Sequence, residues 1–178
     1  MYINHIKILN YRNFHEFEMN FHDGLNVIVG ANNAGKTGLL SAINLLYESS
    51  SISVDDFNKN DLQAKCTSVY KDVPPEIVIE YHIKHQISED NTADESIIKL
   101  LSFIGMDEIE TSKTASGDPT NYTLSACVKA KYTLNPKNVG DYIQAVSGAL
   151  IMKRFLPCSS CFKSIMVGYI QMVFQKHL

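Results

Sequence analysis

The chain has 178 residues, of which 45% are hydrophobic and 20% charged, and its formal net charge is −3. The length is typical of one domain, or of one domain plus an appendage. The composition excludes a disordered or collagen-like protein, and the net charge excludes a protein that attracts nucleic acid through overall positive charge. Four cysteines are too few for a disulfide-stabilised scaffold. The N-terminal residues lack a signal-peptide pattern and no stretch is cleanly apolar, so we expect a cytoplasmic protein with no membrane attachment.

Four elements are predicted in the first 47 residues. Alternating apolar and polar residues predict strands around residues 6–8 and 17–21, each with one face toward solvent. A short apolar, β-branched run at 25–29 predicts a buried strand. Apolar residues at helical spacing over 36–47 predict an amphipathic helix, which a glycine-rich loop connects to that strand. The segment therefore predicts two antiparallel strands followed by a strand–loop–helix unit.

The remaining sequence predicts further strands and helices separated by polar segments. In chain order we expect a loop over 48–62, a strand over 77–83, a short helix over 93–104, a polar loop over 111–121, a strand over 122–132 and a helix over 138–150. The strand over 122–132 has the most regular alternation in the chain. No internal repeat is visible.

A change in composition divides the chain into residues 1–150, predicted to form one lobe, and a tail over 151–178. All 19 acidic residues lie at or before Asp141, whereas the tail holds four lysines or arginines and no acid. It is either an apolar, basic segment that packs against sequence outside this chain or out-of-frame sequence after a genuine domain fragment; both remain open. Cys158 and Cys161 have the spacing of half a zinc site, but no second pair follows, so no structural zinc is expected.

Residues 30–37 read GANNAGKT and match the phosphate-binding pattern G-x-x-x-x-G-K-[ST] at every position. Glycines allow the backbone to approach phosphate oxygens closely, and the loop N–H groups and helix N-terminus supply partial positive charge. We expect Lys36 to reach the β- and γ-phosphates of ATP and the Thr37 hydroxyl to ligate Mg²⁺. Gly38 is unexpected after the threonine, because glycine weakens a first helical turn.

The sequence around this loop resembles a known family. IKILNYRNF at 6–14 and GLNVIVGANNAGKT at 24–37 resemble the N-terminal lobe of SMC/RecF-type ABC ATPases. Within these, the chain is most similar to the OLD (overcoming lysogenization defect) family of ATP-dependent endonucleases. The match is strong over 1–47 and loose over 76–84 and 122–133. It implies an α/β fold: a P-loop NTPase lobe of the ABC type, incomplete, whose mixed sheet has antiparallel strands at its N-terminal side.

The resemblance also implies roles for residues and partners. Arg12 matches a basic residue that approaches the nucleotide phosphates; the alternative is a surface arginine on a strand turn. Asn32 and Asn33 fit the asparagine-containing loop of the group, although asparagine is also an ordinary turn residue. The full set of expected nucleotide-binding residues is Arg12, Gly30, Asn32, Asn33, Ala34, Gly35, Lys36, Thr37 and Gly38. The resemblance alone implies DNA as a partner. It also implies that ATP is held between two protomers of a homodimer, or between this chain and a full-length partner.

Several parts that ATP hydrolysis and DNA cleavage need are missing from the sequence. No apolar strand ends in Asp-Glu, no Ser-Gly-Gly signature is present, and no carboxylate cluster of a Toprim nuclease domain follows. The Asp55-Asp56 pair resembles the OLD family weakly, and we interpret it as a solvated loop or helix cap. No catalytic residue is therefore predicted.

Three functional hypotheses remain. The first is the ATP-binding part of an OLD-like ATPase/endonuclease that acts on DNA. The second is a RecF- or SMC-like repair ATPase without nuclease activity, and the third is a truncated, non-catalytic product. ATP hydrolysis is expected of the full-length parent; for this chain alone we expect no nuclease activity and negligible ATP turnover.

Overall fold

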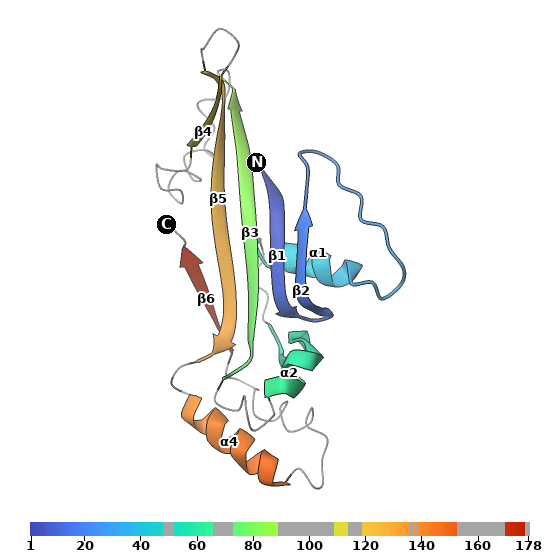
Figure 1. Ribbon diagram of the computed structural model, residues 1–178, viewed down its shortest axis with the longest axis vertical. Helices are drawn as coiled ribbons and strands as arrows, with labels where there is room; N and C mark the ends of the chain where they lie inside the picture. The colour runs from blue at the N-terminus through green and yellow to red at the C-terminus, as the bar shows by residue number, and fades with distance from the viewer. Residues whose placement is uncertain are drawn as a thin grey trace.

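The computed structural model contains one antiparallel sheet with helices on one side and at one end (Figure 1). It describes residues 1–47, 52–65, 73–88, 109–113, 119–135, 137, 139–152 and 170–176. The strands are β1 (Tyr2–Tyr11), β2 (Phe14–Asn20), β3 (Glu76–Ser88), β4 (Ile109–Lys113), β5 (Pro119–Leu134) and β6 (Ile170–Lys176). The helices are α1 (Lys36–Asn44), α2 (Lys59–Lys65) and α4 (Val139–Met152), with a short 3-10 turn, η1 (Val54–Asp56). The strand order is β2-β1-β3-β5-β4, and β6 also pairs with β5.

The strands predicted from alternation over 6–8, 17–21, 77–83 and 122–132 are confirmed, and each is longer than predicted or shifted by a few residues. The helices predicted over 36–47 and 138–150 are also confirmed, as α1 and α4. One face of the sheet carries the buried apolar side chains and packs against α1. Its fully buried members include Ile6, Ile8, Ile79 and Tyr81 on the strands and Ala42 on α1. Alternation predicted these strands because every second residue is needed in this core.

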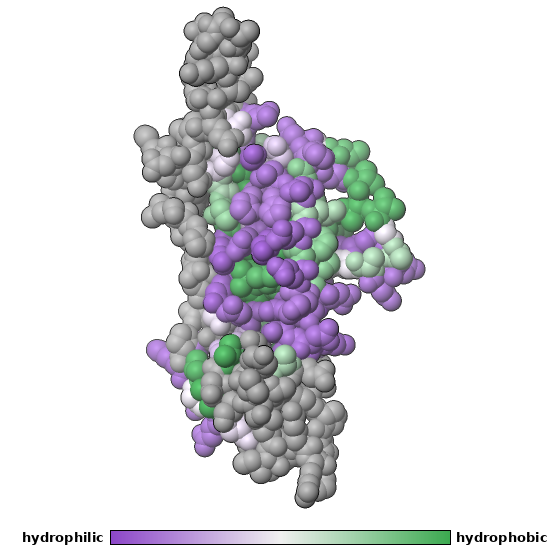
Figure 2. Space-filling model, viewed as in Figure 1, coloured by the Kyte–Doolittle hydropathy of each residue, from purple (hydrophilic) through white to green (hydrophobic). Residues whose placement is uncertain are grey.

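The other face of the sheet is hydrophilic and is the face seen in Figure 2. Glu18, Lys7, Glu80 and Lys129 lie directly opposite one another on β2, β1, β3 and β5. Lys7 contacts Glu18 at 2.6 Å and Lys129 contacts Glu80 at 2.7 Å. Charges of alternating sign therefore pair across the strands, which is typical of a solvent-facing sheet surface.

A tyrosine fixes α1 to the sheet. The buried Tyr81 hydroxyl on β3 donates a hydrogen bond of 2.6 Å to the carbonyl oxygen of Ala42. Ala42 lies in the last turn of α1, where carbonyl groups lack helical N–H partners. The contact satisfies that carbonyl and fixes the position of the helix whose first turn carries Lys36 and Thr37, the last two residues of the phosphate-binding motif.

The predicted strand over 25–29 is wrong in the structure. Residues 21–31 form no strand, and Leu25, Val27 and Val29 are 92%, 73% and 87% exposed. Their apolar side chains gather on the loop between β2 and α1 at the right of Figure 2. A strand buried on both faces needs a neighbour on each edge, and no strand in the described residues pairs with this segment. The predicted mixed sheet is corrected for the same reason, because every strand pair in the described ranges is antiparallel.

Two predicted loops contain regular structure. The segment 48–62 includes η1 and the start of α2, although its polar composition predicts a loop. Asn58 caps α2, because its Oδ1 accepts hydrogen bonds from the N–H groups of Asn60 and Asp61 at 3.0 and 3.3 Å. The segment 111–121 supplies the end of β4 and the start of β5.

Other predictions lie outside the described residues, namely the helix over 93–104 and the Cys158–Cys161 pair. The tail contributes β6 at the edge of the sheet, and the division at residue 150 stays a prediction. No helix in the described part of the chain is long and apolar enough to cross a bilayer.

Candidate nucleotide-binding site

The turn between β1 and β2 supplies one wall of the site. Asn10 and Arg12 have positive φ angles of 57° and 49°, conformations that asparagine tolerates and that arginine adopts less readily. These two residues reverse the chain, so that Asn13 and Phe14 lie beside the phosphate-binding loop. The motif NYRNF therefore forms a turn that places Arg12, Asn13 and Phe14 beside the loop, while Tyr11 is buried in the core.

The loop itself is closed by the lysine of the motif. The Lys36 ammonium donates hydrogen bonds to the carbonyl oxygens of Gly30 and Ala31, at 2.5 and 2.7 Å. Gly35, with φ +92°, is the N-cap residue of α1 and makes no side-chain cap, and no acidic residue lies in the first turn. The N–H groups at this helix end therefore face the loop without a competing carboxylate, which is the arrangement that favours an anion.

The Phe14 ring lies close to both glycines at the start of α1 and leaves little room for a side chain at either position. A Cβ atom on Gly35 would lie 2.7 Å from Phe14 Cζ, and a Cβ on Gly38 would lie 3.3 Å from Phe14 Cε2. The Phe14 ring also packs against Phe17 with a centroid distance of 4.4 Å and an angle of 34° between the ring planes. Gly38, which weakens the helix locally, thus allows the β1–β2 turn to approach the first helical turn closely without displacing the Phe14 ring.

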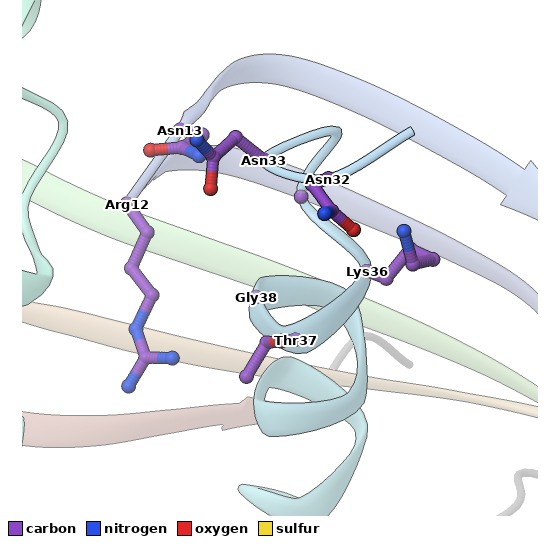
Figure 3. Close-up of a pocket in the computed structure, with 8 residues that line it drawn as sticks. Arg12, Asn13, Asn32, Asn33, Lys36, Thr37 and Gly38 are labelled. Carbon is purple, nitrogen blue, oxygen red and sulfur yellow. The ribbon is translucent and has the colours of Figure 1, made fainter. Parts of the chain in front are cut away.

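These elements surround one cavity of about 530 Å³. Its lining residues are Arg12, Asn13, Asn32, Asn33, Gly35, Lys36, Thr37 and Gly38. Figure 3 shows Arg12 on one side of the loop and Lys36 on the other, with Asn32 and Asn33 between them. Of the residues predicted from sequence, Gly30 and Ala34 do not line the cavity. Gly30 gives its carbonyl to Lys36, and the Ala34 N–H donates to Ala31 within the loop at 3.2 Å.

Arg12 is held from two directions. Its Nε donates to Oδ1 of Asp56 at 2.9 Å, and its Nη1 donates to Oγ of Ser41 on α1 at 3.0 Å. Its guanidinium also lies 5.1 Å from the centre of the Tyr11 ring. Burial alone would raise the pKa of the Asp56 carboxyl, but hydrogen bonds from Ser53 and Arg12 lower that pKa below its usual value. A carboxylate paired in this way stays charged near neutral pH.

The interpretation of Asp56 as a solvated loop residue is wrong, since its side chain is 14% exposed and pairs with Arg12. The cap interpretation fits in part, because Asp56 Oδ2 accepts hydrogen bonds from Ser53 N and Oγ. Asn13, Ser41 and Asp56 are the residues near the site that sequence reasoning did not assign to it. Asn13 had a signal, its place in the NYRNF motif, whereas Ser41 had none.

Comparison with known proteins bears on this site directly. The model of the AAA ATPase domain family matches residues 1–143, most of the chain. The chain belongs to the AAA ATPase domain family. Membership in this family implies nucleotide binding, and the matched range includes the whole cavity.

Individual relatives of this AAA ATPase domain match over a shorter segment. The DNA replication and repair proteins RecF of Bacillus thuringiensis, Bacillus cereus and Bacillus anthracis are each 48% identical to it over 46 residues. That segment covers 26% of this chain and 12% of each relative. The similarity to RecF is therefore partial.

Proposed function

We propose that this AAA ATPase domain binds Mg-ATP in the cavity between the β1–β2 turn and the N-terminus of α1. The observation that carries the proposal is the placement of two cationic side chains, Arg12 and Lys36, around one uncapped helix N-terminus. The cavity volume lies within the range of small-molecule sites. Two cations and a helix N-terminus suit a ligand with several negative charges, such as a nucleoside triphosphate.

Each residue then has a role that its position supports. Phosphate oxygens would replace the carbonyl oxygens of Gly30 and Ala31 as acceptors for the Lys36 ammonium. Thr37, in the first turn of α1, would place its hydroxyl on Mg²⁺. Arg12 would meet the phosphates from the side opposite Lys36.

The wider function we propose is that of the nucleotide-binding part of an OLD-like ATPase/endonuclease acting on DNA, with ATP held between two protomers. The NYRNF turn and the phosphate-binding loop support this proposal by resemblance. The described residues contain no group of His, Cys, Asp or Glu side chains that could hold a metal ion. We therefore assign nuclease chemistry to none of the described residues. Since the sequence shows no apolar strand ending in Asp-Glu, we propose that the chain alone binds nucleotide with negligible turnover.

A RecF-like ATPase without nuclease activity is the second candidate. The 48% identity to RecF over 46 residues favours it. In a longer parent protein, a Toprim carboxylate cluster downstream of the ATPase segment would select the OLD-like function, and its absence would select the RecF-like one.

The nucleotide-binding proposal is tested by thermal unfolding of the full chain with Mg-ATP, Mg-ADP and AMP. A ligand present at 100 times its Kd stabilises the folded state by about 2.7 kcal/mol. We expect Mg-ATP to raise the Tm of the wild type and of Lys59→Ala, an exposed lysine on α2 that serves as the control. Lys36→Ala should lose that rise, and AMP should give little. An equal rise for Lys36→Ala and wild type would refute the proposal.

A further inference from the structure

The arginine that faces the cavity is held in place by a segment far along the chain. Arg12 and Asp56 are 44 residues apart in sequence, and their side chains meet at 2.9 Å. The second contact of the guanidinium, with Ser41 at 3.0 Å, comes from the same helix whose first turn carries Lys36 and Thr37. The arginine carries five N–H donors. Donors thus remain for an anionic ligand after these two contacts.

The segment 53–58 also holds the backbone of the turn. The Arg12 N–H donates to the Asp56 carbonyl at 2.6 Å, and Asn58 Nδ2 donates to the Arg12 carbonyl at 2.9 Å. Asn58 N–H donates to the Asn10 carbonyl at 2.9 Å, and Tyr11 pairs with Phe57 as an isolated β-bridge. These contacts maintain the left-handed conformation of Arg12, which an arginine does not favour by itself.

Both carboxylate oxygens of Asp56 are engaged. Oδ1 accepts from Arg12, while Oδ2 accepts from the N–H and hydroxyl of Ser53 at 2.9 and 3.0 Å. Ser53 therefore orients the carboxylate, and the carboxylate orients the guanidinium. With its oxygens used in this way, Asp56 is suited to hold another side chain rather than to bind a metal ion or to accept a proton from a substrate.

We propose that Asp56 is a positioning residue that holds the Arg12 guanidinium at the cavity wall, ready for the phosphates of a bound nucleotide. This inference rests on the proposed function. An arginine that is already ordered loses less side-chain entropy when the ligand binds, so the affinity is higher than with a mobile arginine. Asp56 thereby strengthens the binding of an anion although it is itself an anion beside the site.

Positioning of Arg12 and direct repulsion of phosphate predict opposite changes in affinity when the Asp56 charge is removed. Removal of a negative charge near a phosphate site strengthens binding if only long-range electrostatics matter. If Asp56 acts by positioning Arg12, Asp56→Asn weakens binding instead, by about fivefold, the size expected for ordering one long side chain. Asp55→Asn is the matched control, because it removes the same charge one residue earlier from an exposed side chain.

The experiment is isothermal titration of the full chain with the Mg²⁺ complex of a non-hydrolysable ATP analogue. The variants are Asp56→Asn, Asp55→Asn, Arg12→Ala, the double variant Arg12→Ala/Asp56→Asn, and Lys36→Ala. We expect Kd to rise about fivefold in Asp56→Asn and to stay unchanged or fall slightly in Asp55→Asn. In the Arg12→Ala background, Asp56→Asn should change Kd less than about twofold, because its effect passes through the arginine.

If Lys36→Ala abolishes binding, the proposed function stands, and two results would still overturn the inference. The first is that Asp56→Asn binds the analogue as tightly as the wild type does. The second is that Asp56→Asn raises Kd by the same factor in the wild type and in the Arg12→Ala background. Undiminished binding by Lys36→Ala would refute the proposed function and this inference with it. If Asp56→Asn does not fold, Asp56→Glu takes its place. Its carboxylate is displaced by one methylene, so a Kd between those of the wild type and Arg12→Ala supports the inference, and a wild-type Kd overturns it.

Discussion

Replacement of two glycines by alanine should have unequal effects on stability, because only one of them has a positive φ angle. Both lie against the Phe14 ring, which is the nearest group to a Cβ atom built on either glycine. Gly35 has φ +92°, whereas Gly38 is a buried residue inside the helix. Gly35→Ala therefore imposes backbone strain together with crowding, whereas Gly38→Ala imposes crowding without that strain.

The magnitudes follow from the geometry. Gly35→Ala places a Cβ 2.7 Å from Phe14 Cζ and forces alanine into a left-handed conformation. Overpacking costs about 1–3 kcal/mol and the conformation about 1–2 kcal/mol, so the free energy of unfolding should fall by about 2–5 kcal/mol. Gly38→Ala places a Cβ 3.3 Å from Phe14 Cε2. Its crowding is offset by a gain of about 1 kcal/mol in helix propensity, so the net change should stay within about 1 kcal/mol.

A second background isolates the role of the ring. In Phe14→Ala, Gly38→Ala should stabilise the chain by about 1 kcal/mol, because only the helix-propensity gain remains. Gly35→Ala should still destabilise it by about 1–2 kcal/mol, because the positive φ angle is unchanged. Urea denaturation followed by circular dichroism measures all four differences. Equal effects of the two alanines in both backgrounds would refute this reasoning.

Three further predictions concern the loop, the cap and the ion pair. Val27→Lys should change the free energy of unfolding by less than about 0.5 kcal/mol, since Val27 is exposed. Ile79→Ala in the core should lower it by about 2–5 kcal/mol. A cost above about 2 kcal/mol for Val27→Lys would mean that the segment around Val27 is buried. Asn58→Ala should cost about 1–2 kcal/mol in urea denaturation, because it removes both the α2 cap and the hydrogen bond to the Arg12 carbonyl. No measurable cost would contradict the capping role. The wild type should unfold with a larger free energy than Asp56→Asn, and this difference should be fully present above the ordinary carboxyl pKa of 3.8. It should disappear as pH falls through the lower pKa of Asp56 in the folded state, because the protonated carboxyl no longer pairs with Arg12. An advantage that grows with acidification would contradict the ion pair.

Much of the sheet could be predicted because its strands have one buried and one solvated face. Alternation in β1, β2, β3 and β5 records that difference directly in the sequence. The phosphate-binding motif was equally readable, since its residue types and spacing are local. Local chemistry therefore located the loop and the helix that follows it.

Contacts between distant segments could not be predicted in the same way. The apolar run 25–29 has the composition of a buried strand, but burial depends on neighbouring strands that a single segment does not encode. The pairing of Arg12 with Asp56 spans 44 residues and is set by how the 53–58 segment packs on the β1–β2 turn. The polar residues of that segment predict a loop, whereas in the structure Asn58 caps α2.

The most direct test of the account is isothermal titration of the wild-type chain and of Lys36→Ala with Mg-ATP. The account predicts one site per chain in the wild type and no measurable heat of binding in Lys36→Ala, with Lys59→Ala indistinguishable from the wild type. Equal affinities in the wild type and Lys36→Ala would contradict the assignment of the cavity as a nucleotide site.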